Sequence, residues 1–457
     1  MMKASSALFF CIFFALSLTN EAYADLEYVD VLLHKIIKAY QLEPYQPKAI
    51  HFGPKERLGR TLFFDSILSG PQGVACASCH IRNLGSGDGL ALAIGIGATG
   101  VSKERESQHD AFVIPRNTLP LFNRGSKEID AFFWDGRVQL GPNGSYESPL
   151  GKSLPSGFDN LLAVASVFPI VEPDEMLGHS RRKVGLSKQH RELVTVDGLD
   201  NNYQARTLNV FENITKRITS DVVNSSVENN IGYKTLFGDA YPEMPFEDIT
   251  ITHIGNALSA YINIAFMLNE SSWDRYIRGD KTALSGMQKR GAILFYGKGR
   301  CAACHRGQHF SDFRFHGLAV PQFRVGKHSR YQDYGRAIAT DKPEQRYTFR
   351  TPSLRNVYET GPWAHNGSFT SIKKIIQHHI NPILTLYQAE TADPEQGRYT
   401  GRILSSRSDI LAEIGLLSDR EIEELLSFLT SLSSSYILSD DLAIPSASAS
   451  DNSLIEK

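Results

Sequence analysis

The chain has 457 residues, of which 42% are apolar and 21% are charged, and its formal net charge at pH 7 is −2. This composition is typical of globular proteins, and the length allows two or three domains. The near-neutral charge argues against a nucleic acid or an anionic membrane surface as the main partner.

Residues 1–24 have the pattern of a secretory signal peptide. A positively charged start precedes an apolar run over residues 7–18, and Ala22 and Ala24 provide a small-x-small cleavage site. A buried N-terminal helix is the alternative, whereas the apolar run is too short and wrongly flanked for a membrane anchor. We therefore expect export to the periplasm, removal of this segment together with Cys11, and a mature chain without a membrane span.

Four cysteines remain in the mature chain, and all of them fall in two copies of the spacing C-x-x-C-H. The two motifs are Cys76, Cys79 and His80, and Cys301, Cys304 and His305. This spacing is typical of covalent c-type haem attachment, in which two thioether bonds hold the porphyrin and the adjacent histidine ligates the iron. A four-cysteine zinc site, a redox-active C-x-x-C pair and two disulfides are the alternatives. Because every mature cysteine obeys the longer motif, the sequence predicts two covalently bound haem c groups.

A short internal repeat precedes the two motifs. Residues 59–64 (GRTLFF) and residues 291–296 (GAILFY) each end a stretch with helical apolar spacing. A third helix is expected over residues 418–432, where Ser418 and Glu421 form a capping box and leucines follow at helical spacing. The predicted fold class is therefore mainly α, with two cytochrome c-like helical haem domains and long loops.

These elements divide the mature chain into two domains and a tail. We expect an N-terminal domain with insertions over residues 25–279 and a C-terminal domain over residues 280–432. Residues 433–457 are rich in Ser, Ala and Asp and contain a proline, which is typical of a disordered tail. Residues 178–213 are polar and weakly periodic, which indicates an elaboration on the surface of the first domain.

Four further segments resemble one known family, the bacterial dihaem cytochrome c peroxidases and their MauG-like relatives. They occur in the family's order: residues 116–118 (RNT) with 122–123 (FN), 133–137 (FWDGR), 173–176 (PDEM), and 351–357 (TPSLRNV) running on to 362–367 (PWAHNG). Each piece alone is weakly specific, whereas their combination with two C-x-x-C-H motifs is specific. The resemblance implies that the first domain carries a peroxidatic haem and the second an electron-transfer haem.

The same resemblance implies roles for individual residues. Glu175 matches the distal carboxylate, which moves a proton between the two oxygens of peroxide, and Trp134 matches an aromatic bridge between the two haem groups. Asn117, with the backbone carbonyls of Thr360 and Pro362, matches a calcium site made of hard oxygen donors. From the residues alone, the alternatives are an exposed loop glutamate, a tryptophan in the core and an asparagine in a turn. The family's distal glutamine has no match, because the loop after the FWDGR segment is longer here.

The sixth iron ligands decide how the two haem groups react. His109 stands where peroxidases with a closed resting state carry a distal histidine, and a solvent-facing histidine in this polar stretch is the alternative. For the second haem, the family's axial methionine (tyrosine in MauG-like members) falls on His379, and no methionine follows Met287. Residues 372–380 have helical spacing, so His379 shares the apolar side while His378 points about 100° away. We therefore expect bis-histidine ligation through His379, with His378 as the fallback, and a lowered reduction potential.

Three functions follow as hypotheses. The first is a periplasmic peroxidase that reduces hydrogen peroxide to water with electrons from a small donor protein, a cytochrome c or a cupredoxin. The second is a MauG-like oxidase that modifies tyrosine or tryptophan side chains of a partner protein. The third is a dihaem electron carrier without catalysis, against which Glu175 argues. Family members often form homodimers, but this sequence shows no interface signature.

Overall fold

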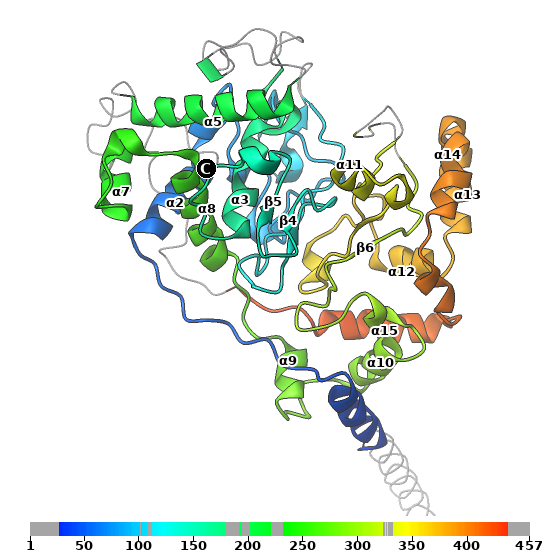
Figure 1. Cartoon of the computed structure of the whole chain (residues 1–457). Helices are drawn as coiled ribbons and strands as arrows, with labels where there is room; N and C mark the ends of the chain where they lie inside the picture. The colour runs from blue at the N-terminus through cyan, green and yellow to red at the C-terminus, as the bar shows by residue number, and fades with distance from the viewer. Residues whose placement is uncertain are drawn as a thin grey trace, which may run out of the picture.

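The computed structural model describes residues 27–100, 102–107, 112–179, 192–193, 202–220, 232–322, 325, 327 and 332–436. Two helical bodies lie side by side, and long loops with short strands connect them (Figure 1). Helices dominate the described residues, so the predicted mainly α fold class is confirmed. Among the helices that the structure describes, none is long and apolar enough to cross a membrane. The predicted signal peptide lies outside the described residues.

The first body is built around the crossing of two helices. They are α2 (Pro54–Phe64), which precedes the first cysteine motif, and α8 (Ile251–Ala265). α2 begins at a proline, and the Glu56 carboxylate accepts a hydrogen bond from the Gly53 amide at 3.0 Å, which closes the first turn. Gly59 lets the two helices touch, because a Cβ at this position would lie 1.9 Å from the Ala257 carbonyl oxygen.

The second body repeats this crossing with helices α10 (Gly286–Tyr296) and α15 (Asp419–Thr430). The capping box predicted at the start of α15 is present. A Cβ on Gly291 would lie 1.9 Å from the Glu424 carbonyl oxygen. The glycine that begins each copy of the sequence repeat therefore marks the same close helix contact in both bodies.

Further helices surround the two crossings. In the first body they are α3 (Leu161–Val167), α5 (Tyr203–Thr219) and α7 (Tyr233–Ala240). In the second body they are α9 (Ser272–Ile277), α11 (Arg336–Thr340), α12 (Ile372–Ile380), α13 (Ile383–Ala392) and α14 (Pro394–Ser405). α13 and α14 form a helical hairpin at the outer edge of the second body (Figure 1).

The strands of the described residues are short and antiparallel. They are β1 (Ala98–Thr99) with β2 (Glu106–Ser107), β3 (Ala131–Phe132) with β4 (Val138–Leu140) and β5 (Tyr146–Glu147), and β6 (Phe315–His316) with β7 (Phe349–Arg350). The FWDGR segment forms the turn between β3 and β4, and β7 runs directly into the TPSLRNV segment. Both family segments are therefore held in place by a strand pair.

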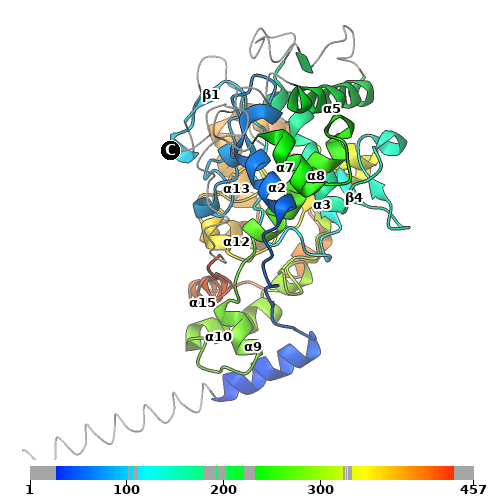
Figure 2. The same ribbon diagram turned by 90° about the vertical axis from the view of Figure 1, so that its left-hand side faces the viewer.

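The N-terminal helix belongs to the core of the second body. A helix over residues 27–39 lies along α9 and α10 (Figure 2), and its Leu33 is buried in the same cluster as Trp273 of α9. The predicted assignment of residues 25–279 to the first domain therefore needs correction at both ends. The apolar pattern of an amphipathic helix shows that one face of the helix must be buried, but it does not show which core that face packs against.

Two other predicted boundaries also change. Residues 433–436, assigned to the tail, are part of the fold, because the Tyr436 hydroxyl donates to the Arg82 carbonyl at 2.6 Å. The remainder of the predicted tail lies outside the described residues. Part of the expected surface elaboration at residues 178–213 is also core, since α5 begins within it and buries Phe211 in the first body.

Candidate functional site

The first C-x-x-C-H motif forms a tight 3₁₀ turn directly after α2. Cys76 and Cys79 lie on this turn, and His80 follows. Nδ1 of His80 lies 3.0 Å from the Ser86 carbonyl oxygen, to which the ring N–H donates. This hydrogen bond fixes the ring and leaves Nε2 free to ligate a metal. Burial lowers the pKa of His80 to about 4, so the imidazole is neutral, as a ligand must be.

The second motif has the same geometry after α10. Nδ1 of His305 lies 3.0 Å from the Phe310 carbonyl oxygen, which again leaves Nε2 free. Burial lowers the pKa of His305 to about 4. Cys301 and Cys304 form no disulfide, and they line a different cavity from the first cysteine pair. This arrangement argues against both the disulfide and the shared zinc alternatives.

Each motif opens into its own large cavity, and the residues present fit one haem in each. Together with the part that opens to solvent, the space free of protein atoms is about 1290 Å³ at the N-terminal cavity and about 1730 Å³ at the C-terminal cavity. A haem c needs an apolar slot, two thiols and an axial histidine, and each cavity provides them. The carboxylates of a haem also need partners, and the buried guanidinium of Arg350 has two nitrogens without a hydrogen-bond partner.

The two cavities share one wall. Trp134, Asn117, Pro120 and Arg350 line both of them. Nε1 of Trp134 donates to the Asn117 carbonyl at 2.8 Å, and the Arg350 amide donates to the Trp134 carbonyl at 2.9 Å. These bonds hold the indole, which is 7% exposed, between the two sites. Trp134 therefore lies between the N-terminal cavity and the C-terminal cavity.

Glu175 lines the N-terminal cavity. It lies on a π-helical turn, η7 (Pro173–Leu177), a kind of turn that is frequent at functional sites. Burial raises the pKa of the Glu175 carboxyl, and the charge of Glu172 raises it further, whereas Arg137 and Lys327 act in the opposite direction. A carboxyl group with a raised pKa can both accept and return a proton closer to neutral pH.

A neighbouring loop fixes the position of this turn. The Ile96 amide donates to the Asp174 carbonyl at 3.2 Å, and a Cβ on Gly95 would lie 1.8 Å from the same oxygen. Arg105 stabilises this loop, because its guanidinium donates hydrogen bonds to three loop carbonyl oxygens at 2.6 to 2.9 Å. The turn that carries Glu175 is therefore anchored through its backbone.

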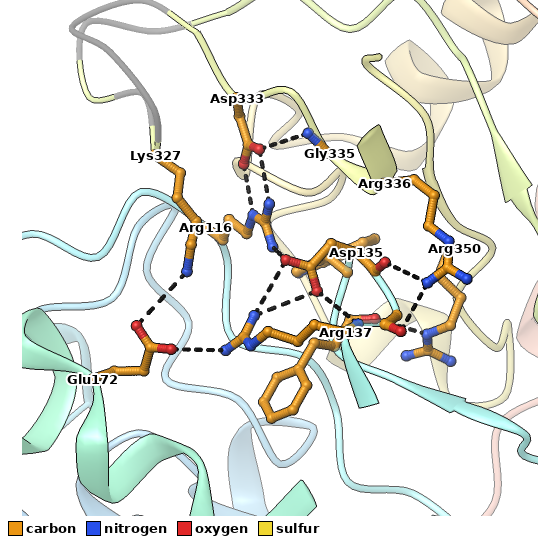
Figure 3. A network of polar contacts seen from close by, with 12 residues as sticks. Arg116, Asp135, Arg137, Glu172, Lys327, Asp333, Gly335, Arg336 and Arg350 are labelled. Atoms are coloured by element: carbon orange, nitrogen blue, oxygen red, sulfur yellow. Dashed lines mark hydrogen bonds and ion pairs between the residues drawn. The ribbon is translucent and has the colours of Figure 1, made fainter. Parts of the chain in front are cut away.

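A buried charge network connects the region around Glu172 to the second domain (Figure 3). Arg116 pairs with Asp135 at 2.6 Å and with both carboxylate oxygens of Asp333 at 2.6 and 2.8 Å. Arg137 lies 3.3 Å from Asp135 and 3.8 Å from Glu172. Although burial opposes ionisation, Arg116 and Arg137 hold the pKa of Asp135 well below its usual range. Residues of both domains thus fix the positions of the charges near Glu175.

The two adjacent histidines of α12 point in different directions. His379 lines the C-terminal cavity, and its Nδ1 lies 2.7 Å from the Ile375 carbonyl oxygen, which leaves Nε2 free. His378 is not among the residues that line this cavity. Its Nε2 donates to the Leu318 carbonyl at 2.9 Å, and the side chain is fully buried. The geometry therefore favours His379 over His378 as an iron ligand.

A further imidazole in the C-terminal cavity has no role in the sequence analysis. His365 stacks on Phe349 with ring centroids 3.6 Å apart, and its buried Nε2 has no hydrogen-bond partner. Burial lowers its pKa to about 3. His379 lies near enough to His305 for its charge to lower the pKa of that proximal histidine. This proximity makes His379 the better candidate for the opposite face of the haem.

The three residues expected to bind calcium line one cavity. Asn117, Thr360 and Pro362 all line the C-terminal cavity. The side-chain nitrogen of Asn117 donates to the Leu90 carbonyl at 2.9 Å, which directs the amide group and leaves its oxygen for another partner. His109, the expected distal ligand of the first haem, lies outside the described residues.

Several arginines that line the two cavities had no role assigned from the sequence. Arg124 and Arg137 line the N-terminal cavity, and Arg350 lines both cavities. Arg137 is the last residue of the FWDGR segment and Arg350 immediately precedes the TPSLRNV segment, so their only signal was a position within or next to a family segment. Arg124 had no signal, because its place in the wall follows from the tertiary fold.

Comparison with known proteins identifies relatives of this sequence. The family model for di-haem cytochrome c peroxidases matches residues 54–282, half of the chain. The methylamine utilization protein MauG of Methylorubrum extorquens is 29% identical over 335 residues, which cover 73% of this chain and 71% of that protein. The cytochrome-c peroxidase IdrP1 of a Pseudomonas species is 26% identical over 416 residues, which cover 86% of this chain and 84% of that protein.

Solved structures show the same fold. A MauG-like protein associated with microbial copper homeostasis superposes with a TM-score of 0.57 at 21% identity and covers 89% of this chain and 97% of its own. The diheme peroxidase BthA from Burkholderia thailandensis gives a TM-score of 0.54 at 19% identity, with 86% of this chain and 90% of its own covered. At this identity the likeness establishes the architecture alone.

Proposed function

The chain belongs to the di-haem cytochrome c peroxidase family, and on that premise we propose that it reduces hydrogen peroxide to water at the N-terminal haem. Two electrons come from a small periplasmic donor protein through the C-terminal haem, and two protons complete the formation of two water molecules. When bound, the haem irons supply the one-electron redox chemistry and the position at which peroxide is cleaved. The observation that carries the proposal is Glu175, a half-buried residue whose carboxyl group has a raised pKa and lies in the wall of the N-terminal cavity.

In this reaction Glu175 accepts the proton of one peroxide oxygen and returns it to the other, which then leaves as water. The raised pKa of Glu175 serves both halves of this transfer, because general acid and base strength balance when the pKa lies near the working pH. The charges of Arg137 and Lys327 favour the ionised form of Glu175, which the first proton transfer requires. The anchored turn holds the carboxyl group in position before peroxide enters.

Trp134 is the proposed relay between the two haem groups. Its indole is buried in the wall that the two cavities share, and its one N–H is already bonded to the Asn117 carbonyl. A hydrogen-bonded aromatic ring fixed between two redox centres shortens each step of electron transfer. His80 and His305 are the proposed proximal ligands, and His379 is the proposed sixth ligand of the C-terminal haem.

The E175Q variant tests the proposed reaction. Glutamine keeps the size of the side chain but cannot accept the proton, so peroxide-dependent oxidation of reduced cytochrome c should fall roughly 100- to 10,000-fold. The optical spectra of both haem groups should stay as in the wild type. E243Q is the matched control, because Glu243 is exposed and remote from both cavities. Unchanged turnover in E175Q rejects the role of Glu175.

We also propose a structural Ca²⁺ ion held by the Asn117 side chain and the carbonyls of Thr360 and Pro362, with water completing the coordination. All three line the C-terminal cavity beside the shared wall. Removing calcium with a chelator should therefore change the spectrum of the C-terminal haem, and added Ca²⁺ should restore it. Metal analysis that finds no calcium in the active protein contradicts the site.

A second function, oxidation of side chains in a partner protein, has one specific observation in its favour. Among the described residues that line the C-terminal cavity there is no methionine, and His379 lies there instead. The relative MauG is 29% identical over most of this chain. Peroxide added with reduced cytochrome c separates the two functions. If the cytochrome stays reduced while the enzyme consumes peroxide, the oxidase function replaces the peroxidase.

A further inference from the structure

Arg350 carries a buried positive charge for which the described protein provides too few partners. Its side chain lies in β7 and is 1% exposed. Nε donates to the Phe133 carbonyl at 3.0 Å, but both terminal nitrogens lack a hydrogen-bond partner. Leaving such groups unpaired in a protein interior is strongly unfavourable, so we expect an anionic ligand to bind them.

The position of Arg350 is fixed from several sides. Its amide donates to the Trp134 carbonyl at 2.9 Å, and it stands opposite Phe315 in the β6–β7 pair. The Nε bond to Phe133 adds a second tie to the same segment (Figure 3). The guanidinium is therefore held in the wall that both cavities share, and it contributes to the lining of each.

Arg124 is a second buried cation on the N-terminal side. It is 5% exposed, lines the N-terminal cavity, and donates from Nε to the Pro120 carbonyl at 2.7 Å. Burial lowers the pKa of Arg124, and the charge of Arg350 lowers it further. In the described part of the chain neither arginine forms a salt bridge with a carboxylate, whereas nearby Arg116 has two such partners. An anionic ligand in the N-terminal cavity, which both arginines line, would offset their mutual repulsion.

We propose that Arg350 and Arg124 bind the propionate carboxylates of the two haem groups, with Arg350 shared by both. The propionates are the anionic substituents of a haem, and a guanidinium binds a carboxylate with two parallel hydrogen bonds. Arg350 has two unused terminal nitrogens and reaches both cavities, whereas Arg124 reaches the N-terminal cavity only. This inference rests on the two haem groups of the family and not on the proposed peroxide reaction.

Sharing one cation couples the two redox centres electrostatically. A positive charge beside a haem stabilises the reduced state, which carries one positive charge less than the oxidised state. Because Arg350 acts on both sites, its loss must lower both reduction potentials. Loss of Arg124 must lower the potential of the N-terminal haem alone. Loss of Arg350 and loss of Arg124 should therefore have different effects on the two reduction potentials.

Spectropotentiometry of the haem-loaded R350Q, R124Q and R336Q proteins tests the inference. Arg336 is the control, since it is buried in the same region and donates to the carbonyls of Asp135 and Gly136, but lines neither cavity. We expect R350Q to lower both potentials, R124Q only that of the N-terminal haem, and R336Q neither. If the R350Q variant shifts the reduction potential of one haem only, Arg350 is not shared by the two haem groups. If it shifts neither potential, Arg350 does not bind a propionate.

Resonance Raman spectra give a readout that does not depend on potentials. The propionate-bending bands of both haem groups should change in R350K, because a lysine keeps the charge but loses the paired hydrogen bonds. If R350Q fails to accumulate with two haem groups, R350K and R124Q decide the question. Unchanged propionate bands in R350K, or an unchanged N-terminal potential in R124Q, would then refute the proposal.

Discussion

Replacing Gly59 or Gly291 by alanine should force apart the helix crossing at the centre of each domain. A Cβ on Gly59 would lie 1.9 Å from the Ala257 carbonyl oxygen, and a Cβ on Gly291 would lie 1.9 Å from the Glu424 carbonyl oxygen. An ordinary carbon–oxygen contact is about 3.3 Å, so the helices must part by about 1.4 Å. The opposing atoms belong to the backbone and cannot rotate away as a side chain can.

Two opposing effects determine how much unfolding free energy the G59A and G291A variants should lose. Overpacking a well-packed contact costs about 1–3 kcal/mol, and the displacement required here puts both variants at the upper end of this range. The better helix propensity of alanine offsets roughly 1 kcal/mol. We therefore expect G59A and G291A each to lose about 2 kcal/mol of unfolding free energy.

Guanidinium unfolding of the haem-loaded protein, followed by circular dichroism and haem absorbance, measures this loss. Gly238 in α7 and Gly401 in α14 are matched controls, one in each domain. Both are exposed, and a Cβ at either position would meet nothing within 4 Å. Alanine at these positions should raise stability by about 1 kcal/mol. Neutral G59A and G291A variants, or equal losses at the control positions, would refute the reasoning.

Three further predictions concern the site. Protonated Glu175 cannot accept the proton of peroxide, so turnover should fall as the pH drops through the raised pKa of Glu175. The E172Q variant removes a negative charge that raises this pKa. It should therefore move the acid limb of the pH profile to lower pH. H379M should raise the reduction potential of the C-terminal haem and leave that of the N-terminal haem nearly unchanged, as measured by spectropotentiometry. R116A removes the main counter-charge of buried Asp333 and should cost about 3–5 kcal/mol in denaturant unfolding. The first prediction is wrong if the acid limb does not move in E172Q, and the second is wrong if the C-terminal potential is unchanged in H379M. The third is wrong if R116A is as stable as the wild type.

The features predicted from the sequence are those encoded in short stretches of chain. A C-x-x-C-H motif specifies both attachment points and the proximal ligand within five residues, so His80 and His305 could be found without knowing the fold. The capping box of α15 is equally local. The spacing along α12 was enough to separate His379 from His378, because a helix turns neighbouring side chains in different directions.

Features that depend on packing between distant segments could not be predicted in this way. The helix over residues 27–39 has an apolar face, but only the tertiary fold shows that it packs with Trp273 in the second domain. α8 supplies the second half of the crossing at Gly59, yet it lies almost two hundred residues further along the chain. Arg350 appears in sequence as one of many basic residues, and its lack of partners is visible only once its surroundings are known.

The wall between the two cavities is built from both domains. Trp134 comes from the first domain and Arg350 from the second, and they are joined by a backbone hydrogen bond of 2.9 Å. The buried pair of Arg116 and Asp333 ties the same two domains a short distance along the chain. Rotating one domain against the other would break both ties, and separating the buried ion pair alone costs several kcal/mol. Both contacts therefore oppose a change in the separation of the two cavities.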